Sequence, residues 1–185
     1  MNHIVYEING GYPLKGSIIC SGAKNLATKT MVASLLTNST TTLYNVPNIG
    51  DVSITKELLS SVGSSIDWCK NKQYMMINSQ YIHNLPIVSS KNLRNRIPIL
   101  MIGALIHRVK EIILPIVGGD LIGERNVSYH INILKCFGVT VLQKKDCYVA
   151  KLYKELQPSN ITLPFPSVGA TETFLFLSVL TKGTV

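Results

Sequence analysis

MIGALIHRVKEIILPIVGGD (residues 101–120) aligns with MVASLLTNSTTTLYNVPNIGD (31–51), which lies about 70 residues earlier in the same chain. A third segment, SVLTKGTV (178–185), aligns without gaps with SLLTNSTT (34–41). Segments that recur at a constant spacing indicate repeated structural units. We therefore expect three related units rather than one irregular domain.

Each predicted unit begins with a helix, at 26–36, 97–107 and 171–180. A strand and a second helix follow, at 41–47 and 54–62 in the first unit and at 111–117 and 127–137 in the second. Gly63 or Gly138 ends the second helix, and a hairpin follows, with strands at 65–69 and 74–78 or at 140–143 and 147–152. A further strand, 16–20 or 160–164, is expected to lead into a unit. This alternation predicts an α/β fold.

The first helix of each unit lacks a wide polar face. The segments ASLL (33–36), IPILMIGALI (97–106) and FLFLSVL (174–180) are almost entirely apolar. Helices that are apolar all round are normally buried. We therefore expect a pseudo-threefold arrangement, with these helices at the centre and with sheets and amphipathic helices outside. A doubly wound sheet with exterior helices would instead require a polar stripe on each helix.

The composition is that of a globular protein. Of the 185 residues, 46% are hydrophobic and 15% are charged, which suffices for a buried core. The longest uncharged apolar run, 97–106, is about half of the roughly 20 residues that a membrane span needs. The N-terminal segment MNHIVYEINGGYPL lacks the basic and apolar regions of a secretory signal. These features predict a cytoplasmic protein that does not contact a membrane.

The charge balance favours an anionic partner. The chain has 18 basic and 10 acidic residues, for a net charge of +8. Nucleic acid and phosphorylated small molecules both fit that balance, although the basic residues do not alternate with aromatic ones and no recognisable nucleic-acid-binding motif occurs.

The cysteines and histidines show no spacing typical of metal ligands. Cys20, Cys69, Cys136 and Cys147 each lie in or beside an apolar pattern, so we expect buried free thiols rather than disulfides or a zinc site. The four histidines are scattered. We predict neither a metal nor another cofactor.

The third predicted unit stops at Val185, directly after its first helix and the start of a strand. A second helix and a hairpin, which complete the other two units, are missing. We therefore expect this chain to be a fragment or one part of a split protein.

A glycine-rich loop (113–130, ILPIVGGDLIGERNVSYH) places Asp120 and Arg125 five residues apart, between a predicted strand and a predicted helix. The glycines Gly118, Gly119 and Gly123 allow a ligand to approach the backbone closely. A GGD sequence by itself is more often an ordinary turn than a site.

Polar residues stand where each apolar helix starts. Lys24 and Asn25 precede the first helix, Arg96 precedes the second, and Ser167, Val168 and Gly169 precede the third. Taken singly, each is more simply a solvated helix start or a cap. Helix N-termini carry unpaired N–H donors and a partial positive charge, so three of them at one end of a domain would bind anions.

Five motifs resemble those of the UDP-N-acetylglucosamine enolpyruvyl transferases of peptidoglycan synthesis. They are CSGAKN (20–25), NVPNIGDV (45–52), RIPILMIGALIHR (96–108), PIVGGDLIGER (115–125) and PSVGATE (166–172). The resemblance implies a domain of the inside-out α/β barrel type, with buried central helices and outer sheets. It further implies that 1–185 is a nearly complete first domain of a two-domain enzyme, and that 1–15 forms a strand with the missing second domain.

The reaction implied by the resemblance moves the enolpyruvyl group of phosphoenolpyruvate to the 3′-hydroxyl of UDP-N-acetylglucosamine and releases phosphate. The partners implied are these two substrates and the second domain, with no nucleic acid and no membrane. The chain alone is expected to be weakly active or inactive. A shikimate-pathway enolpyruvyl transferase and a non-catalytic module that binds anions or nucleic acid stay open as alternatives.

The resemblance also implies residue roles. Lys24 and Arg125 would hold phosphoenolpyruvate, and Asp120, standing where most members carry a cysteine, would be the general acid. The implied substrate-binding residues are Lys24, Asn25, Arg96, Arg125, Asn126, Val127, Ser128, Ser167, Val168 and Gly169. Asn126, Ser128 and Phe165 depart from the residues usual at their positions, which suggests altered contacts to the sugar nucleotide. Because a carboxylate offers no thiolate to an epoxide, we predict resistance to fosfomycin.

Overall fold

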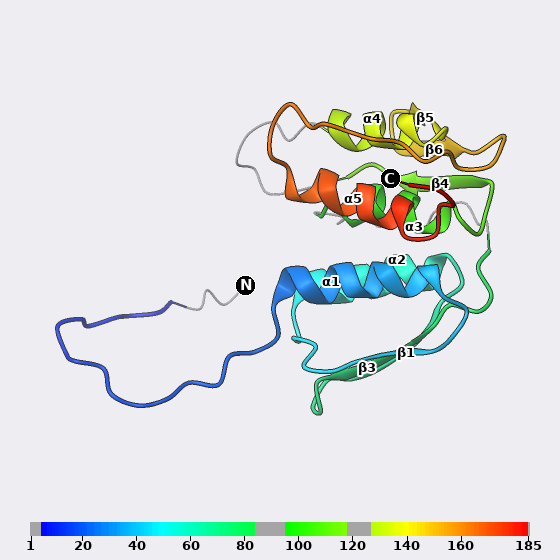
Figure 1. Ribbon diagram of the computed structural model, residues 1–185. Coiled ribbons are helices and arrows are strands. Elements are labelled where there is room, and N and C mark those ends of the chain that lie inside the picture. Colours follow the sequence, from blue (N-terminus) through cyan, green and yellow to red (C-terminus); the bar gives the residue numbers. More distant parts are fainter. Residues whose placement is uncertain (1–4, 84–94, 118–126, 185) are drawn as a thin grey trace.

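The computed structural model describes residues 5–83, 95–117 and 127–184. Two halves of similar construction follow one another along the chain (Figure 1). The first contains α1 (Lys24–Ala33), the 3-10 turn η1 (Ser34–Leu36), β1 (Thr41–Leu43), α2 (Gly50–Ser61), β2 (Ser65–Cys69) and β3 (Tyr74–Asn78). The second contains α3 (Ile97–Leu105), β4 (Glu111–Pro115), α4 (Ser128–Cys136), β5 (Thr140–Gln143) and β6 (Cys147–Lys151), and is followed by α5 (Val168–Ser178).

The two sheets have the same topology, which confirms the predicted repeat. In each, the hairpin's second strand lies in the middle and pairs antiparallel with both neighbours, in the orders β1-β3-β2 and β4-β6-β5. The hairpin of the first half has the predicted bounds, and Gly63 and Gly138 follow α2 and α4 with positive φ angles of 105° and 88°. Glycine adopts this conformation without a Cβ clash, which explains why both helices end there.

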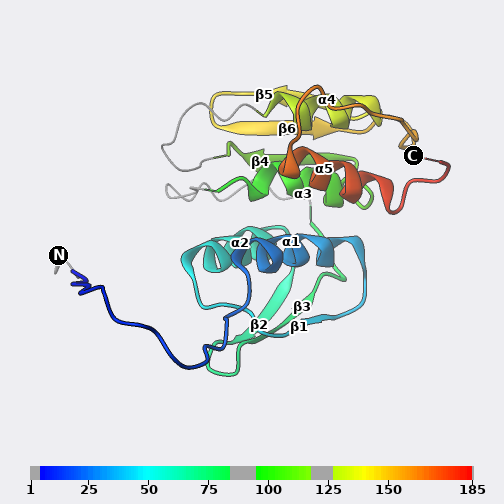
Figure 2. The ribbon, with the colours of Figure 1, turned by 60° about the vertical axis from the view of Figure 1, so that its left-hand side comes forward.

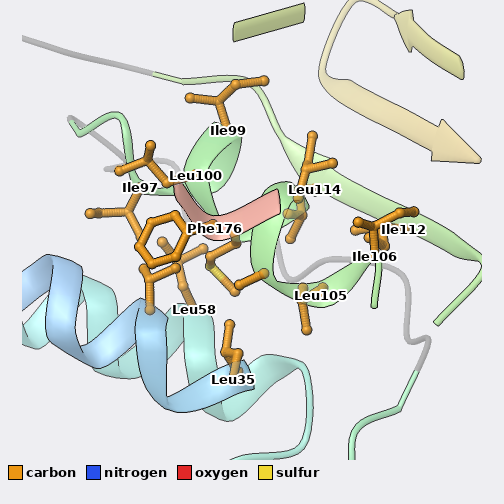
Figure 3. Packing of buried hydrophobic residues seen from close by; sticks show 14 of the residues in the cluster. Leu35, Leu58, Ile97, Ile99, Leu100, Leu105, Ile106, Ile112, Leu114 and Phe176 are labelled. Atoms are coloured by element: carbon orange, nitrogen blue, oxygen red, sulfur yellow. The ribbon is translucent and has the colours of Figure 1, made fainter. Parts of the chain in front are cut away.

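The core lies where the halves meet. Every residue of α3 is buried, and this helix packs against α1, α5 and β4. Figure 3 shows the apolar side chains of α3 beside Leu35 and Leu58 of the first half, Leu114 of β4 and Phe176 of α5. Helices α1 and α2 cover one face of the first sheet and turn their other side toward α3 and α5 (Figure 2). The uninterrupted apolar sequence of α3 therefore predicted its burial correctly.

The expectation that all three apolar helices are buried all round is wrong for α1 and α5. Leu26 of α1 is 65% exposed and Leu175 of α5 is 58% exposed, and Val179 and Leu180 after α5 are exposed as well. Each of these helices packs on other elements over part of its circumference, α1 on α2 and α3, and α5 on α3 and α4. The described residues thus place one helix, rather than three, at the centre.

The additional strands predicted at 16–20 and 160–164 do not form. Residues 5–21 are exposed along their whole length, and the segment runs away from the folded body (Figure 1). In 160–164 the apolar residues Ile161 and Leu163 pack against the core, but the backbone belongs to neither sheet. Alternation alone does not make a strand, because a strand also needs a neighbour that offers hydrogen bonds.

The cysteines are free, as predicted, but the prediction that they are buried is wrong. Cys20 and Cys136 are exposed, and Cys69 and Cys147 are half-buried. Cys69 ends β2, Cys147 begins β6, and Cys136 is the last residue of α4, so each of these three lies at the end of an element rather than in its buried middle.

Arg108, which follows the C-terminal end of α3, joins the two halves. Its guanidinium donates hydrogen bonds to the backbone carbonyls of Leu35, Thr37, Ser79 and Gln80. Carbonyls at the ends of η1 and β3 are thereby satisfied by one planar side chain. Within the described residues, no helix is long and apolar enough to cross a membrane.

Candidate functional site

A cavity of about 790 Å³ lies where α1, α3 and α5 begin. The residues that line it come from the start of each helix and from the segments beside them. They are Lys24, Asn25, Thr28, Lys29, Gly50, Asp51, Ile54, Asn95, Arg96, Ile97, Leu100, Tyr129, His130, Phe165, Pro166, Ser167, Val168, Gly169 and Glu172.

The start of α1 is held against the start of α2. The backbone N–H of Gly22 donates to Oδ1 of Asn45 at 3.1 Å, and a Cβ at position 22 would overlap the Asn45 carbonyl oxygen. Lys24, the first residue of α1, forms an ion pair with Asp51 in the first turn of α2, with 3.4 Å between Nζ and Oδ2. The motifs CSGAKN and NVPNIGDV are therefore two parts of one wall of the cavity.

The start of α3 contributes Asn95 and Arg96. Arg96 is the N-cap residue, and Pro98 stands in the first turn, where the missing N–H of proline costs no helical hydrogen bond. The side-chain oxygen of Asn95 accepts a hydrogen bond from the backbone N–H of Ile97 at 3.2 Å. Asn95 therefore satisfies one of the donors that the helix start leaves unpaired.

The start of α5 is formed by the sequence PSVGATE. Ser167 is the N-cap residue, and its Oγ accepts from the backbone N–H of Ala170 at 3.3 Å. Gly169 lies against the ring of His130, because a Cβ at position 169 would come within 3.0 Å of Cε1. A small residue is therefore required where α5 passes α4.

His130 connects α4 to α5 beside the cavity. Its Nδ1 lies 2.8 Å from Oγ1 of Thr173, and that hydroxyl donates to the carbonyl oxygen of Gly169 at 3.3 Å. The hydroxyl has one proton, so when it donates to the Gly169 carbonyl, Nδ1 of His130 is the donor to Thr173. Burial and the nearby positive charge of Arg96 lower the pKa of His130 to about 4. The ring is therefore neutral at pH 7.

A second ion pair crosses from α1 to α5. Nζ of Lys29 lies 3.7 Å from Oε1 of Glu172, and both side chains are about one-quarter exposed, at 24% and 23%. Burial raises the pKa of Glu172, and the nearby Lys29 partly opposes that rise. This pair links helices of the first and third predicted units across the cavity.

The cavity is suited to an anion. Three cationic side chains (Lys24, Lys29 and Arg96) line it, against two carboxylates (Asp51 and Glu172). The N-terminal ends of α1, α2, α3 and α5 all lie at the cavity, and each contributes a partial positive charge. His130 adds a neutral acceptor rather than a further charge. Such a lining can hold phosphate or carboxylate groups together with neutral hydroxyl or amide groups. Among the described residues, no group of three potential metal-binding side chains occurs.

The structure brings six of the predicted site residues to this cavity: Lys24, Asn25, Arg96, Ser167, Val168 and Gly169. Val127 and Ser128 stand at the start of α4 and are outside the cavity lining. Asp120, Arg125 and Asn126, with the glycines Gly118, Gly119 and Gly123, lie outside the described residues. Phe165, named for its departure from the usual residue, is part of the lining.

Sequence reasoning missed Asn95, Lys29 and Glu172 as members of the lining. Asn95 directly precedes Arg96 at a predicted helix start, so a search for capping side chains could have found it. The Lys29–Glu172 pair left no local signal, because the two residues are far apart in the sequence.

Comparison with known proteins gives concordant results. A family model described as EPSP synthase (3-phosphoshikimate 1-carboxyvinyltransferase) matches residues 8–185. The UDP-N-acetylglucosamine 1-carboxyvinyltransferase of Chlamydia abortus is 44% identical over 178 residues, which cover 96% of this chain and 40% of that protein. The proteins of the same name from Protochlamydia amoebophila and Prochlorococcus marinus are 41% and 39% identical, over 97% and 96% of this chain.

Among solved structures, the enolpyruvyl transferase NikO from Streptomyces tendae has a similar fold, with a TM-score of 0.76 and 18% identity over 94% of this chain and 40% of that protein. An EPSP synthase from Acinetobacter baumannii matches with a TM-score of 0.66 and 17% identity, over 91% of this chain and 39% of its own. At these identities the likeness concerns the fold alone. The chain spans about 40% of the length of the relatives that it matches.

Proposed function

Because the chain belongs to the EPSP synthase (3-phosphoshikimate 1-carboxyvinyltransferase) family, we propose that it is the first substrate-binding domain of an enolpyruvyl transferase of peptidoglycan synthesis. The enzyme transfers the enolpyruvyl group of phosphoenolpyruvate to the 3′-hydroxyl of UDP-N-acetylglucosamine and releases phosphate. The name shared by relatives that are 39% to 44% identical supports this choice of substrates. Within such an enzyme the domain has the inside-out α/β barrel form, and the protein acts in the cytoplasm.

The observation that carries the proposal is the gathering of Lys24, Asn25 and Arg96 with the 167–169 turn around one cavity. These residues come from three motifs that are far apart in the sequence, and each motif lies at the start of a different helix, α1, α3 or α5. A cation-lined cavity at helix N-termini fits two substrates that both carry phosphate. Lys24 binds the phosphoenolpyruvate anion, and Asn25, Arg96 and the 167–169 turn bind the sugar nucleotide.

In the first step a base takes the proton of the sugar 3′-hydroxyl, the hydroxyl oxygen bonds to C2 of phosphoenolpyruvate, and a proton is added to C3. The tetrahedral adduct then loses phosphate and a proton from C3, which leaves the enolpyruvyl ether. Lys24 and Arg125 stabilise the negative charge of the adduct, and Asp120 donates the proton to C3. The roles of Asp120, Arg125, Asn126, Val127 and Ser128 rest on the sequence motif. An aspartate in place of a thiol also supports insensitivity to fosfomycin.

The direct test is phosphate release in a fusion of residues 1–185 with the remaining part of the Chlamydia abortus relative. We expect release that requires both substrates, and we expect Lys24→Met to lower kcat/KM by about 100-fold or more, as loss of a transition-state contact does. The matched control, Lys135→Met, changes an exposed lysine of α4 and should keep the activity of the unchanged fusion. The proposal is wrong if Lys24→Met is as active as this control.

A shikimate-pathway transferase is the second candidate, because the matching family model carries that description. The two candidates differ in the acceptor substrate. In the same fusion, shikimate 3-phosphate should neither replace nor inhibit UDP-N-acetylglucosamine. Turnover with shikimate 3-phosphate would favour the second candidate.

A further inference from the structure

A buried pair of side chains, His130 and Thr173, ties the start of α5 to α4. Oγ1 of Thr173 lies 2.8 Å from Nδ1 of His130 and donates to the carbonyl oxygen of Gly169 at 3.3 Å. The ring of His130 also packs on Gly169, where an added Cβ would lie 3.0 Å from Cε1. Both members of the pair therefore contact the last residue of the 167–169 turn.

The two members of the pair differ in their access to the cavity. His130 lines it together with Ser167, Val168 and Gly169, whereas Thr173 is not one of the lining residues. Val168 is exposed, so a ligand can reach the turn, but Thr173 is completely buried. Any effect of the Thr173 hydroxyl on a ligand in this cavity must therefore pass through the turn or through His130.

The backbone ahead of the turn is not held by a sheet. Residues 152–167 form neither a helix nor a strand, and α5 is placed by its packing against α3 and α4. Groups that bind a ligand must be held within about 0.5 Å of the productive geometry, and supporting hydrogen bonds commonly provide that precision. The pair supplies such a bond at the position where the irregular segment becomes a helix.

We propose that Thr173 is a positioning residue for the sugar-nucleotide site, because its hydroxyl, bonded to His130, fixes the 167–169 turn in the orientation that binds the ligand. This inference rests on the proposed function, which assigns the turn to UDP-N-acetylglucosamine. Phosphoenolpyruvate is assigned instead to Lys24 and Arg125, which belong to other parts of the chain. Loss of the hydroxyl should therefore affect the sugar nucleotide and leave phosphoenolpyruvate largely unaffected.

Two substitutions at position 173 separate the hydroxyl from the rest of the side chain. Thr173→Val replaces the hydroxyl with a methyl group of similar size, and Thr173→Ser keeps the hydroxyl. The matched control is His107→Leu. Nε2 of His107 lies 2.9 Å from the carbonyl oxygen of Phe176, farther along α5. The control thus removes a side-chain hydrogen bond that holds the same helix, but it does so outside the cavity lining.

The effect on the turn is measured first, by hydrogen–deuterium exchange on the 185-residue chain without a ligand. In Thr173→Val the backbone N–H groups of Ala170 and Thr171, which bond back to the turn, should exchange about 10-fold faster. The N–H of Val179, at the other end of α5, should keep its rate, which excludes a general loss of stability. His107→Leu should leave the exchange at Ala170 and Thr171 unchanged.

The effect on substrate binding is measured by phosphate release, in the fusion of residues 1–185 with the remaining part of the Chlamydia abortus relative. Thr173→Val should raise the KM for UDP-N-acetylglucosamine about 10-fold, as the loss of about one ligand hydrogen bond does. The value of kcat and the KM for phosphoenolpyruvate should stay close to those of the unchanged fusion. Thr173→Ser and His107→Leu should keep all three values.

Unchanged exchange at Ala170 and Thr171 in Thr173→Val would overturn the inference, whatever the ligand. An unchanged KM for UDP-N-acetylglucosamine would also overturn it, and so would a Thr173→Ser variant as impaired as Thr173→Val. A Thr173→Val protein that is unfolded or uniformly inactive has the same meaning, because the hydroxyl would then support the fold as a whole. In each of these cases the proposed function stands. If the unchanged fusion releases no phosphate, the proposed function fails, and the assignment of Thr173 to a sugar nucleotide fails with it.

Discussion

The pH dependence of stability should report the buried imidazole of His130. Burial and the positive charge of Arg96 lower its pKa from 6.5 to about 4 in the folded protein. In the unfolded chain the same group takes up a proton near pH 6.5. The neutral ring therefore stabilises the fold fully above pH 6.5, and this contribution is lost as the pH falls through about 4.

The size of the effect follows from those two pKa values. At about 1.4 kcal/mol per pH unit, the fall from 6.5 to about 4 corresponds to roughly 3 kcal/mol of unfolding free energy. That is a large part of the 5–15 kcal/mol that is typical of a domain, so it is measurable. Replacing Arg96 by glutamine removes one of the two causes, so the pKa of His130 should rise and the loss of stability should become smaller.

Urea denaturation between pH 7.5 and pH 4, on the unchanged chain and on His130→Gln, measures this contribution. Glutamine can donate to Thr173 in place of Nδ1–H but does not titrate, so its curve should fall by about 3 kcal/mol less over this range. The difference between the two curves removes the contributions of other titrating groups, including Glu172. A His130 ring that titrates near pH 6.5 in an NMR experiment on the folded chain would refute the reasoning.

Three further substitutions test the packing around the cavity and behind it. Gly22→Ala should destabilise the chain by about 2 kcal/mol or more in thermal denaturation, because the new Cβ would overlap a backbone carbonyl. The control Gly50→Ala has open space around the new Cβ and should keep the stability of the unchanged chain. Equal stability of the two variants would contradict this prediction. A double-mutant cycle with Lys29→Met and Glu172→Gln should give a coupling energy of about 1 kcal/mol, and a value near zero would show that the pair does not join α1 to α5. Arg108→Lys should lower the urea midpoint by an amount equivalent to about 2 kcal/mol, since an ammonium group has only three N–H donors for the four carbonyls. An unchanged midpoint would argue against that role.

The elements with a strong local pattern could be predicted from the sequence. The hairpin strands 65–69 and 74–78, the burial of α3 and the helix ends at Gly63 and Gly138 agree with the structure. Each of these features depends on residues that are neighbours in the chain, through the period of a helix or strand or through the φ angle of a glycine. The strand predicted at 16–20 was wrong because pairing requires a partner, and alternation carries no information about one.

The sequence by itself determined the repeat, the type of most elements and the polar groups at the helix starts, because all of these are properties of short segments. Tertiary structure alone decided which of those groups meet. Packing of α1 against α2 brings Gly22 against Asn45, and packing of α1 and α5 around α3 joins Lys29 to Glu172. Contacts between distant residues depend on how elements pack in three dimensions, and local periodicity does not specify that packing.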